Sequence, residues 1–322
     1  MSNTTIATDT RSAFIQDSFV LFLYIITGIV AILGNGFVLA VILRNRTRHF
    51  SSVTYTLIAN MALSDLIAGL IIFAQFGFCS TEALSCGLSM EFMCLMIKLI
   101  QIVSYFVSTY TMTAIAYERL HVMKSPFAPK THPKWYIAIS WIVGIMYITI
   151  CTFNVRVSEF FTPTELISCK VLFQIGFLNK PYVRTIRAVL LMLLQFVIPL
   201  GITSVMYTWL LIQLRCQKIV GEATDDKIAR KKKSNRNLTI MLMFTVIAFA
   251  VSWLPVHIWH LVMFFQIKLK GSKCNSSLAY SLCYWFAVSS CAWNPFIYCL
   301  RGSKFRRTIS DLKIRVLGSS SS

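Results

Sequence analysis

The sequence predicts an all-α membrane protein, a bundle of seven transmembrane helices with a short amphipathic helix after the last one. Hydrophobic residues make up 56% of the chain and charged residues 13%, whereas soluble domains usually carry about 25% charged residues. Seven apolar runs are each long enough to cross a bilayer, which takes roughly 20 helical residues. Basic residues gather in alternate connections between these runs. Together these three observations favour a multi-pass membrane protein.

The apolar runs define the expected elements in order. They cover approximately residues 19–43, 53–78, 92–122, 135–153, 186–214, 238–265 and 277–300. A backbone in lipid must satisfy its own hydrogen bonds, and the alternation of a membrane barrel is absent, so we expect helices. The chain is predicted to be a single domain, with an N-terminal segment 1–18, a helix bundle 19–300, and an amphipathic helix with a short tail 301–322.

Charge predicts the orientation of the bundle. The net charge is +19, and 21 of the 31 basic residues lie in the first, third and fifth connections, at the end of the third span and in the tail. Positively charged loops stay in the cytoplasm. We therefore expect a protein of the plasma membrane whose N-terminus is extracellular. The run "RKKKSNR", Arg230 to Arg236, also resembles a nucleic-acid patch or nuclear signal. Because seven apolar spans accompany this run, we expect it to contact anionic membrane lipids and a cytoplasmic partner, and we expect no nucleic acid as a partner.

Orientation then sorts the outer sites. Among the N-x-[ST] matches, Asn3 and Asn275 fall on the outer side and are predicted glycosylation sites. Cys94 and Cys169 both face the oxidising compartment, where disulfides persist. Whether a second disulfide forms among three further cysteines near the outer surface is left open by the sequence: Cys79, Cys86 and Cys274.

A few polar residues lie inside the predicted spans. Asp65 is the only acid deep in a span, and Asn35 and Asn294 lie at comparable depth. Intramembrane ionisable groups are costly and usually mark function. With Ser108 these residues form a candidate site for a small cation or a water network. The alternative is a hydrogen-bond cluster that only holds helices together.

Short motifs then occur in order, one for each span. They are "GN" at 34–35, "LSDL" at 63–66, "ERL" at 118–120, Trp141, Pro199, "SWLP" at 252–255 and "NPFIY" at 294–298, followed by Phe305. Each motif alone is weak, but the ordered set is specific. The chain resembles a rhodopsin-like (class A) G-protein-coupled receptor over nearly its whole length.

The resemblance implies roles for individual residues. Arg119 is the switch arginine that pairs with Glu118 at rest, Trp253 is the toggle beneath the ligand pocket, and Cys94–Cys169 is the outer disulfide. The implied activation switch comprises Glu118, Arg119, Tyr207, Trp253, Pro255, Asn294, Pro295 and Tyr298. Heterotrimeric G proteins and arrestin are the implied cytoplasmic partners. No cofactor is expected, and the one ion considered is an allosteric sodium ion in the site around Asp65. No acid stands near Asn235 at the foot of the sixth span, so Arg119 lacks a salt-bridge partner seen in some relatives.

The ligand class follows from the middle of the third span. No acid occurs between Glu91 and Glu118, so an ammonium ligand would lack its counter-ion. Gln101 stands where a glutamine is familiar among receptors of the neuropeptide Y and neuropeptide FF groups, which implies a peptide ligand. The candidate pocket residues are Gln75, Lys98, Gln101, Tyr105, His257, His260, Tyr280 and Tyr284.

Other functions stay open as alternatives. Lys98, Arg184 and Arg187 make the expected pocket rim basic, which also suits an anionic lipid or a small carboxylate. A transporter is a remote alternative, because the chain has one buried acid and no inverted repeat. An enzyme is not expected, since no cluster has metal-ligand spacing and no P-loop occurs.

Overall fold

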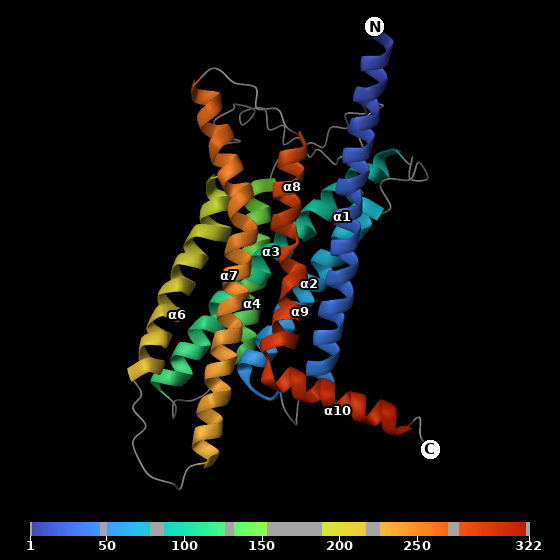
Figure 1. Cartoon of the computed structure of the whole chain (residues 1–322). Helices are drawn as coiled ribbons and strands as arrows, with labels where there is room; N and C mark the ends of the chain where they lie inside the picture. The colour runs from blue at the N-terminus through green and yellow to red at the C-terminus, as the bar shows by residue number, and fades with distance from the viewer. Residues whose placement is uncertain are drawn as a thin grey trace.

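A computed structural model of the chain describes residues 2–45, 50–77, 87–125, 132–152, 189–216, 226–269 and 277–319. Its long helices run side by side, and α10 lies across one end of the bundle (Figure 1). The described helices are α1 (Ser2–Arg44), α2 (Val53–Gly77), α3 (Gly87–Lys124), α4 (Pro133–Thr152), α6 (Ile198–Cys216), α7 (Asp226–Leu269), α8 (Ser277–Val288), α9 (Ser290–Arg301) and α10 (Ser303–Ser319). These residues contain no strand, and the predicted all-α class is confirmed.

The described residues of the predicted apolar runs are helical, apart from Ser289 in the last run. Five stretches are both long and apolar enough to span a membrane: Ser18–Arg44, Val53–Gln75, Leu99–Lys124, Val189–Leu214 and Lys233–Val262. The run predicted at 277–300 is divided into α8 and α9 by Ser289. Several helices extend beyond the predicted runs, most of all α1, which begins at Ser2, and α7, which begins at Asp226. Sequence hydropathy marks only the apolar part of such a helix, so the polar turns were not foreseen.

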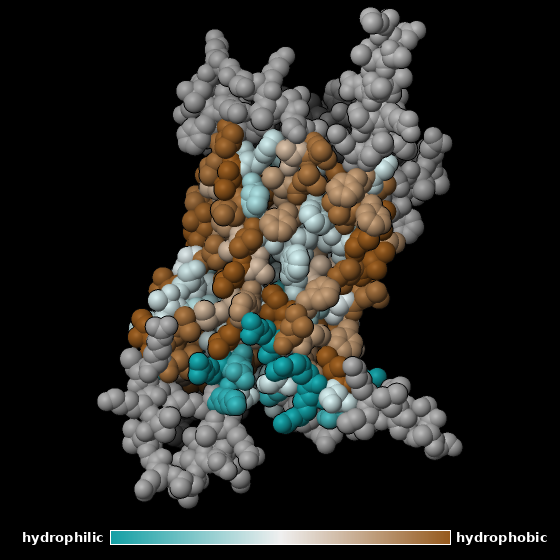
Figure 2. All heavy atoms as spheres, viewed as in Figure 1, coloured by the Kyte–Doolittle hydropathy of each residue, from teal (hydrophilic) through white to brown (hydrophobic). Residues whose placement is uncertain are grey.

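The outside of the bundle is apolar. Large side chains such as Leu33, Val205 and Leu300 are more than half exposed, and hydrophobic residues cover most of the described surface in Figure 2. Hydrophilic residues gather at the end of the bundle beside α10 (Figure 2). A broad apolar surface bounded by charge at one end fits a protein surrounded by lipid.

Small residues allow α1 to approach its neighbours closely. A Cβ at Gly69 of α2 would lie 2.8 Å from the Ala31 Cβ, and a Cβ at Gly34 would lie 2.9 Å from the Pro295 ring. Pro295 has no N–H, so the carbonyl of Cys291, four residues earlier, loses its helical donor. The Asn35 side chain donates to this carbonyl at 2.8 Å. Gly34 and Asn35 therefore fix the proline bend of α9 against α1.

A second proline accompanies a π-helical turn, η2 (Leu193–Val197), just before α6. Because Pro199 has no N–H, the carbonyl five residues earlier, at Leu194, lacks a donor in this wider turn. The Tyr110 hydroxyl of α3 donates to Leu194 O at 3.0 Å. The extra residue of the π turn also brings Gln195 and Phe196 inward, where both are buried.

Candidate functional site

The predicted pocket residues of α3 and α8 form one hydrogen-bonded group. The Gln101 amide donates to the Tyr105 hydroxyl at 3.0 Å, and the Tyr284 hydroxyl donates to Gln101 Oε1 at 3.4 Å. The ring of Tyr284 stacks on Tyr280, with centroids 6.2 Å apart, and His260 of α7 lies 6.0 Å from the Tyr280 ring. The structure thus brings together five of the predicted residues from three helices. We call the end of the bundle that holds Gln101 the pocket end.

Trp253 forms the floor beneath this group. The Tyr105 ring meets the indole edge to face, with centroids 5.1 Å apart, and His257 stacks on the same indole at 5.8 Å. The indole N–H donates to the Ser290 hydroxyl at 3.1 Å. Trp253 therefore contacts side chains of α3 and α9 as well as its own helix, so a change at His257 or Tyr105 reaches α9 through one side chain.

Three buried polar side chains of the pocket end have unused hydrogen-bonding atoms. His257 is 4% exposed, and neither of its ring nitrogens has a partner. Gln195 is 1% exposed with Nε2 unpaired, and Gln75 is 9% exposed with Oε1 unpaired. Leaving a buried polar group unsatisfied costs about 1–3 kcal/mol. A molecule that supplied these missing bonds would therefore stabilise the pocket end.

The middle of the bundle holds the predicted polar network. The Asn294 amide donates to the Asp65 carboxylate at 2.7 Å, and Ser108 also hydrogen-bonds it. These residues line a cavity of about 10 Å³ together with Met112, Phe249 and Ser290. A single water needs roughly 10–15 Å³, so the cavity suits one small guest. Asn35 instead donates to the backbone at Ala31 and Cys291.

Carboxylate and hydroxyl oxygens are the ligands that hard cations prefer. Asp65, Ser108 and Ser290 supply such oxygens, and the donor set therefore fits a sodium ion. In the described part of the chain, no group of three His, Cys, Asp or Glu residues is placed to hold a metal ion. The carboxylate, then, is the only charged ligand that this site offers.

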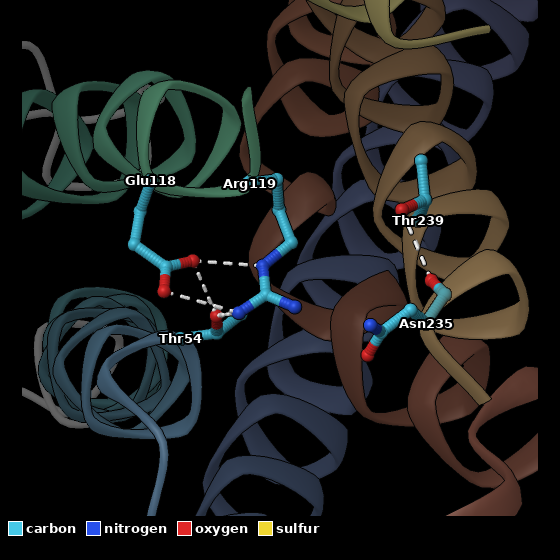
Figure 3. A network of polar contacts seen from close by, with 5 residues as sticks. All are labelled: Thr54, Glu118, Arg119, Asn235 and Thr239. Atoms are coloured by element: carbon cyan, nitrogen blue, oxygen red, sulfur yellow. Dashed lines mark hydrogen bonds and ion pairs between the residues drawn. The ribbon is translucent and has the colours of Figure 1, made fainter. Parts of the chain in front are cut away.

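Two of the predicted switch residues, Glu118 and Arg119, form an ion pair at the opposite end of the bundle, which we call the switch end (Figure 3). Arg119 Nε donates to Glu118 Oε2 at 2.7 Å, and Arg119 Nη2 donates to Glu118 Oε1 at 3.1 Å. The Thr54 hydroxyl of α2 donates to Glu118 Oε2 at 2.6 Å and accepts from Arg119 Nη2. Glu118 is 5% exposed. The ion pair is thus largely dry, and one hydroxyl on a neighbouring helix joins both partners.

Asn235, at the foot of α7, takes no part in this network. Asn235 is exposed, its carbonyl accepts from Thr239 at 3.1 Å, and no interaction joins its side chain to Arg119 (Figure 3). The expectation that Arg119 lacks an acid partner there stays a prediction, because the side chains of residues 226–232 are not described. Thr54 of α2 takes the place that such an acid would have as a second partner of Arg119.

The two switch tyrosines are buried. Tyr298 is 0% exposed and stacks on Phe305 of α10, with centroids 5.8 Å apart. Tyr207 of α6 is 5% exposed. Both tyrosines belong to the hydrophobic core of the bundle.

Several predicted residues lie outside what the structure describes. The backbone at Asn3, Cys94 and Lys98 is helical, but their side chains are not described. The outer disulfide, the second glycosylation site and the basic rim also fall on undescribed positions, namely Cys169, Cys79, Cys86, Cys274, Asn275, Arg184 and Arg187. These predictions remain predictions.

The sequence reasoning missed Gln195 and Thr54. Gln195 is a polar residue in an apolar run, four positions before Pro199, and that isolation was a usable signal. Thr54 begins the second span, and no local pattern distinguishes it from other threonines. Its partners lie 64 and 65 positions away in the sequence.

Comparison with known proteins agrees with this arrangement. The sequence model described as 7 transmembrane receptor (rhodopsin family) matches residues 34–298. The RYamide receptor of Drosophila melanogaster is 27% identical over 305 residues, which cover 92% of this chain and 63% of that receptor. Neuropeptide Y receptor type 4 of Mus musculus is 28% identical, covering 92% of this chain and 79% of the receptor. The human Substance-P receptor is 26% identical, with 88% and 68% covered.

Proposed function

The chain belongs to the rhodopsin family of seven-transmembrane receptors, and on that premise we propose that it binds an extracellular peptide at the pocket end and activates heterotrimeric G proteins at the switch end. The relatives it matches are named as receptors for RYamide, neuropeptide Y and substance P. The Drosophila relative extends beyond the part that this chain covers. The proposal therefore rests on the pocket itself.

The unpaired atoms at His257, Gln195 and Gln75 carry the proposal. Gln195 Nε2 needs an acceptor, Gln75 Oε1 needs a donor, and neutral imidazole offers one of each. A primary carboxamide supplies two donors and one acceptor. The described side chains lining this end carry no formal charge. A peptide that ends in a neutral amide therefore matches the pocket better than a free carboxylate does.

The contacts around Trp253 support a route from pocket to switch. A ligand group bound at His257 would lie directly against the stacked indole, which bonds Ser290 of α9. Pro255 lies inside α7, where the missing N–H weakens the helix and permits a pivot. The foot of α7 can then move without breaking a bond to Arg119. Arg119 leaves Glu118 and Thr54 when a G protein offers it backbone carbonyls.

The charge distribution supports the orientation. Exposed basic side chains at the switch end include Arg44, Lys124, Lys134, Lys233 and Arg236. Positive ends of spans face the cytoplasm, which places the pocket end outside. The cavity at Asp65 lies between the two ends, and we propose that it holds a sodium ion that favours the resting state.

Amidated and free-acid forms of RYamide, neuropeptide Y and substance P peptides test the proposal. Purified receptor in lipid nanodiscs is titrated with each peptide, and guanine-nucleotide exchange on an added G protein is measured. At least one amidated peptide should act, and its free acid should be weaker by tenfold or more, because an unpaired or mismatched buried group costs about 1–3 kcal/mol. Equal potency of the acid and amide forms would contradict the neutral-amide pocket.

Variants locate the effect. His257→Ala and Gln195→Leu should each lower the potency of the active amide by about tenfold. The potency of the free-acid peptide should fall less in both variants. Gln213→Leu is the matched control, because Gln213 Oε1 is also buried and unpaired but lies near the other end of α6. The amidated peptide should be as potent on this variant as on the parent receptor. A loss at Gln213 as large as that at Gln195 would show that helix packing, not ligand contact, sets potency.

A further inference from the structure

A cation–π contact joins α7 to the end of α9 at the switch end. The guanidinium carbon of Arg301, the last residue of α9, lies 4.7 Å from the centroid of the Phe244 ring of α7. Arg301 is exposed and Phe244 is 39% exposed, so the contact lies on the outside of the bundle. A guanidinium within about 6 Å of an aromatic face is attracted by the ring quadrupole. The contact therefore holds together two helices that run side by side (Figure 1).

The same turn of α7 also packs on the corner between α9 and α10. A Cβ at Gly302 would lie 3.0 Å from the Met241 Sδ, so glycine lets α7 approach this corner closely. Met241 is 0% exposed and precedes Phe244 by three residues, which makes the two side chains neighbours on α7. The corner thus meets α7 twice, through Gly302 on the inside and through Arg301 on the outside.

The corner itself is fixed by close packing. Phe305 is 1% exposed, and its ring lies against Tyr298 and Phe50, with centroids 5.8 and 5.1 Å away. The Gly302 N–H donates to Tyr298 O at 2.8 Å. Arg301 therefore extends from a well-packed part of the bundle, and α7 is the side of the contact that is able to move.

Polar contacts hold the foot of α7, residues 233–244, only weakly. Between described residues, its side-chain hydrogen bonding stays within the helix, where Thr239 donates to Asn235 O at 3.1 Å. Among the described side chains outside α7, Arg301 is the one charged group that the structure shows in contact with this segment. The position of the foot therefore depends on apolar packing and on the contact with Arg301.

A pivot at Pro255 would break this contact. Phe244 precedes Pro255 by eleven residues, which is roughly 16 Å along a helix. A change of roughly 20° in the bend would then move Phe244 by about 5 Å. Added to the present separation from Arg301, such a movement exceeds the range of about 6 Å over which a cation attracts a ring. The contact can exist in the straighter form of α7 and not in the pivoted one.

We propose that Arg301 and Phe244 are positioning residues for G-protein activation: their contact holds the foot of α7 against α9 in the resting receptor and breaks when α7 pivots. The inference rests on the proposed function, because it concerns the helix whose movement that function requires. The contact restrains α7 without an acid at its foot, since the ring itself attracts the cation.

The chemistry of the contact predicts how substitutions should behave. Cation–π attraction is strongest for tryptophan, and leucine provides none of it while keeping an apolar side chain. A planar guanidinium stacks on a ring, whereas lysine carries a compact and strongly hydrated charge. If apolar packing alone restrained α7, the effect of Phe244→Leu would be the same with and without the arginine at position 301. The double variant therefore separates the two explanations.

Ligand-free nucleotide exchange on an added G protein is measured with the whole receptor in lipid nanodiscs. Phe244→Leu and Arg301→Gln should each raise it about threefold, because the loss of an exposed cation–π contact shifts the balance toward the pivoted form by that order. The double variant should equal the single variants, since both changes remove one interaction. Arg301→Lys should raise exchange less than Arg301→Gln, and Phe244→Trp should lower it. Effects that multiply in the double variant would overturn the proposal.

A matched control lies within α4. The Lys134 ammonium lies 5.7 Å from the centroid of the Trp135 ring, so this cation–π contact joins no second helix. Lys134→Gln and Trp135→Leu should therefore leave ligand-free exchange at the parental value. A rise as large as that in Phe244→Leu would overturn the proposal, because exchange would then respond to any such change at the membrane surface.

The position of α7 is measured without ligand or G protein. Spin labels are attached through Lys233→Cys at the foot of α7 and Arg44→Cys at the end of α1, both exposed positions, and pulsed electron spin resonance gives their distance distribution. Phe244→Leu should raise the share of a longer distance about threefold, and Phe244→Trp should lower it. An unchanged distribution in Phe244→Leu would overturn the proposal. If the distances shift as expected but no form of the receptor, the parent included, stimulates exchange, the restraint of α7 stands and the proposed G-protein function fails.

Discussion

At the pocket end, buried polar side chains lack partners, whereas at the switch end the buried charges are paired. His257, Gln195 and Gln75 keep unused hydrogen-bonding atoms. Glu118 and Arg119, by contrast, bond to each other and share the Thr54 hydroxyl. The ion pair of the switch end is thus satisfied, although Gln213 near that end also keeps an unpaired oxygen, whereas three polar side chains of the pocket end keep unused atoms. This asymmetry is what a resting receptor needs, because ligand binding gains bonds at one end before any are lost at the other.

The largest expected effect comes from removing the charge at the switch end. Arg119→Ala should lower ligand-stimulated nucleotide exchange by at least about thirtyfold, since a desolvated charge contact is typically worth 2–5 kcal/mol. Normal exchange in this variant would break the comparison, because the paired arginine would then have no role in coupling.

The control for this variant follows from burial. Arg119→Ala leaves Glu118 as an unpaired buried charge, which commonly costs about 3–5 kcal/mol of stability. Combining it with Glu118→Gln should restore folding, measured as surface delivery, without restoring exchange. Recovery of exchange in the double variant would show that the single change acted only through instability.

The local parts of this account could be predicted from the sequence. Apolar runs of about 20 residues fix the spans whatever their neighbours are. Glu118 and Arg119 are adjacent in the chain, so their pairing needed no knowledge of the fold. Thr54 could not be predicted, because its contact depends on how α2 packs against α3. Gln195 was missed for another reason: the π turn adds a residue and shifts the direction of every following side chain.

The middle of the bundle separates the two ends, and there α1 packs against the bend of α9. Gly34→Ala would place a methyl group 2.9 Å from the Pro295 ring, and overpacking of this kind typically costs about 1–3 kcal/mol. The unfolding midpoint of the purified receptor should fall. Gly36→Ala is the matched control, because nothing lies within 4 Å of its added Cβ, and helix propensity favours alanine there. A similar fall in both variants would contradict close packing at Pro295.

The smallest expected effect concerns the sodium ion that we propose for the cavity at Asp65. Replacing a bulky cation by sodium at equal ionic strength should lower agonist affinity roughly fivefold, at the low end of usual couplings. Sodium bound near Asp65 would favour the resting state and oppose the agonist. Asp65→Asn should erase the difference. If sodium has no effect on the parent, Asp65 serves only to bond Asn294 and Ser108.

The central claim is that the ion pair at the switch end lowers the affinity of the pocket end for its peptide. Variants of Thr54 test this claim most directly. Thr54→Val removes the hydroxyl that joins both members of the ion pair, and hydrogen bonds to charged groups are worth about 1.5–3 kcal/mol. Coupling between sites is reciprocal. The affinity of the active amidated peptide, measured without G protein, should therefore rise by about tenfold in Thr54→Val and stay at the parental value in Thr54→Ser. Unchanged peptide affinity in Thr54→Val, alongside raised ligand-free exchange, would contradict the account.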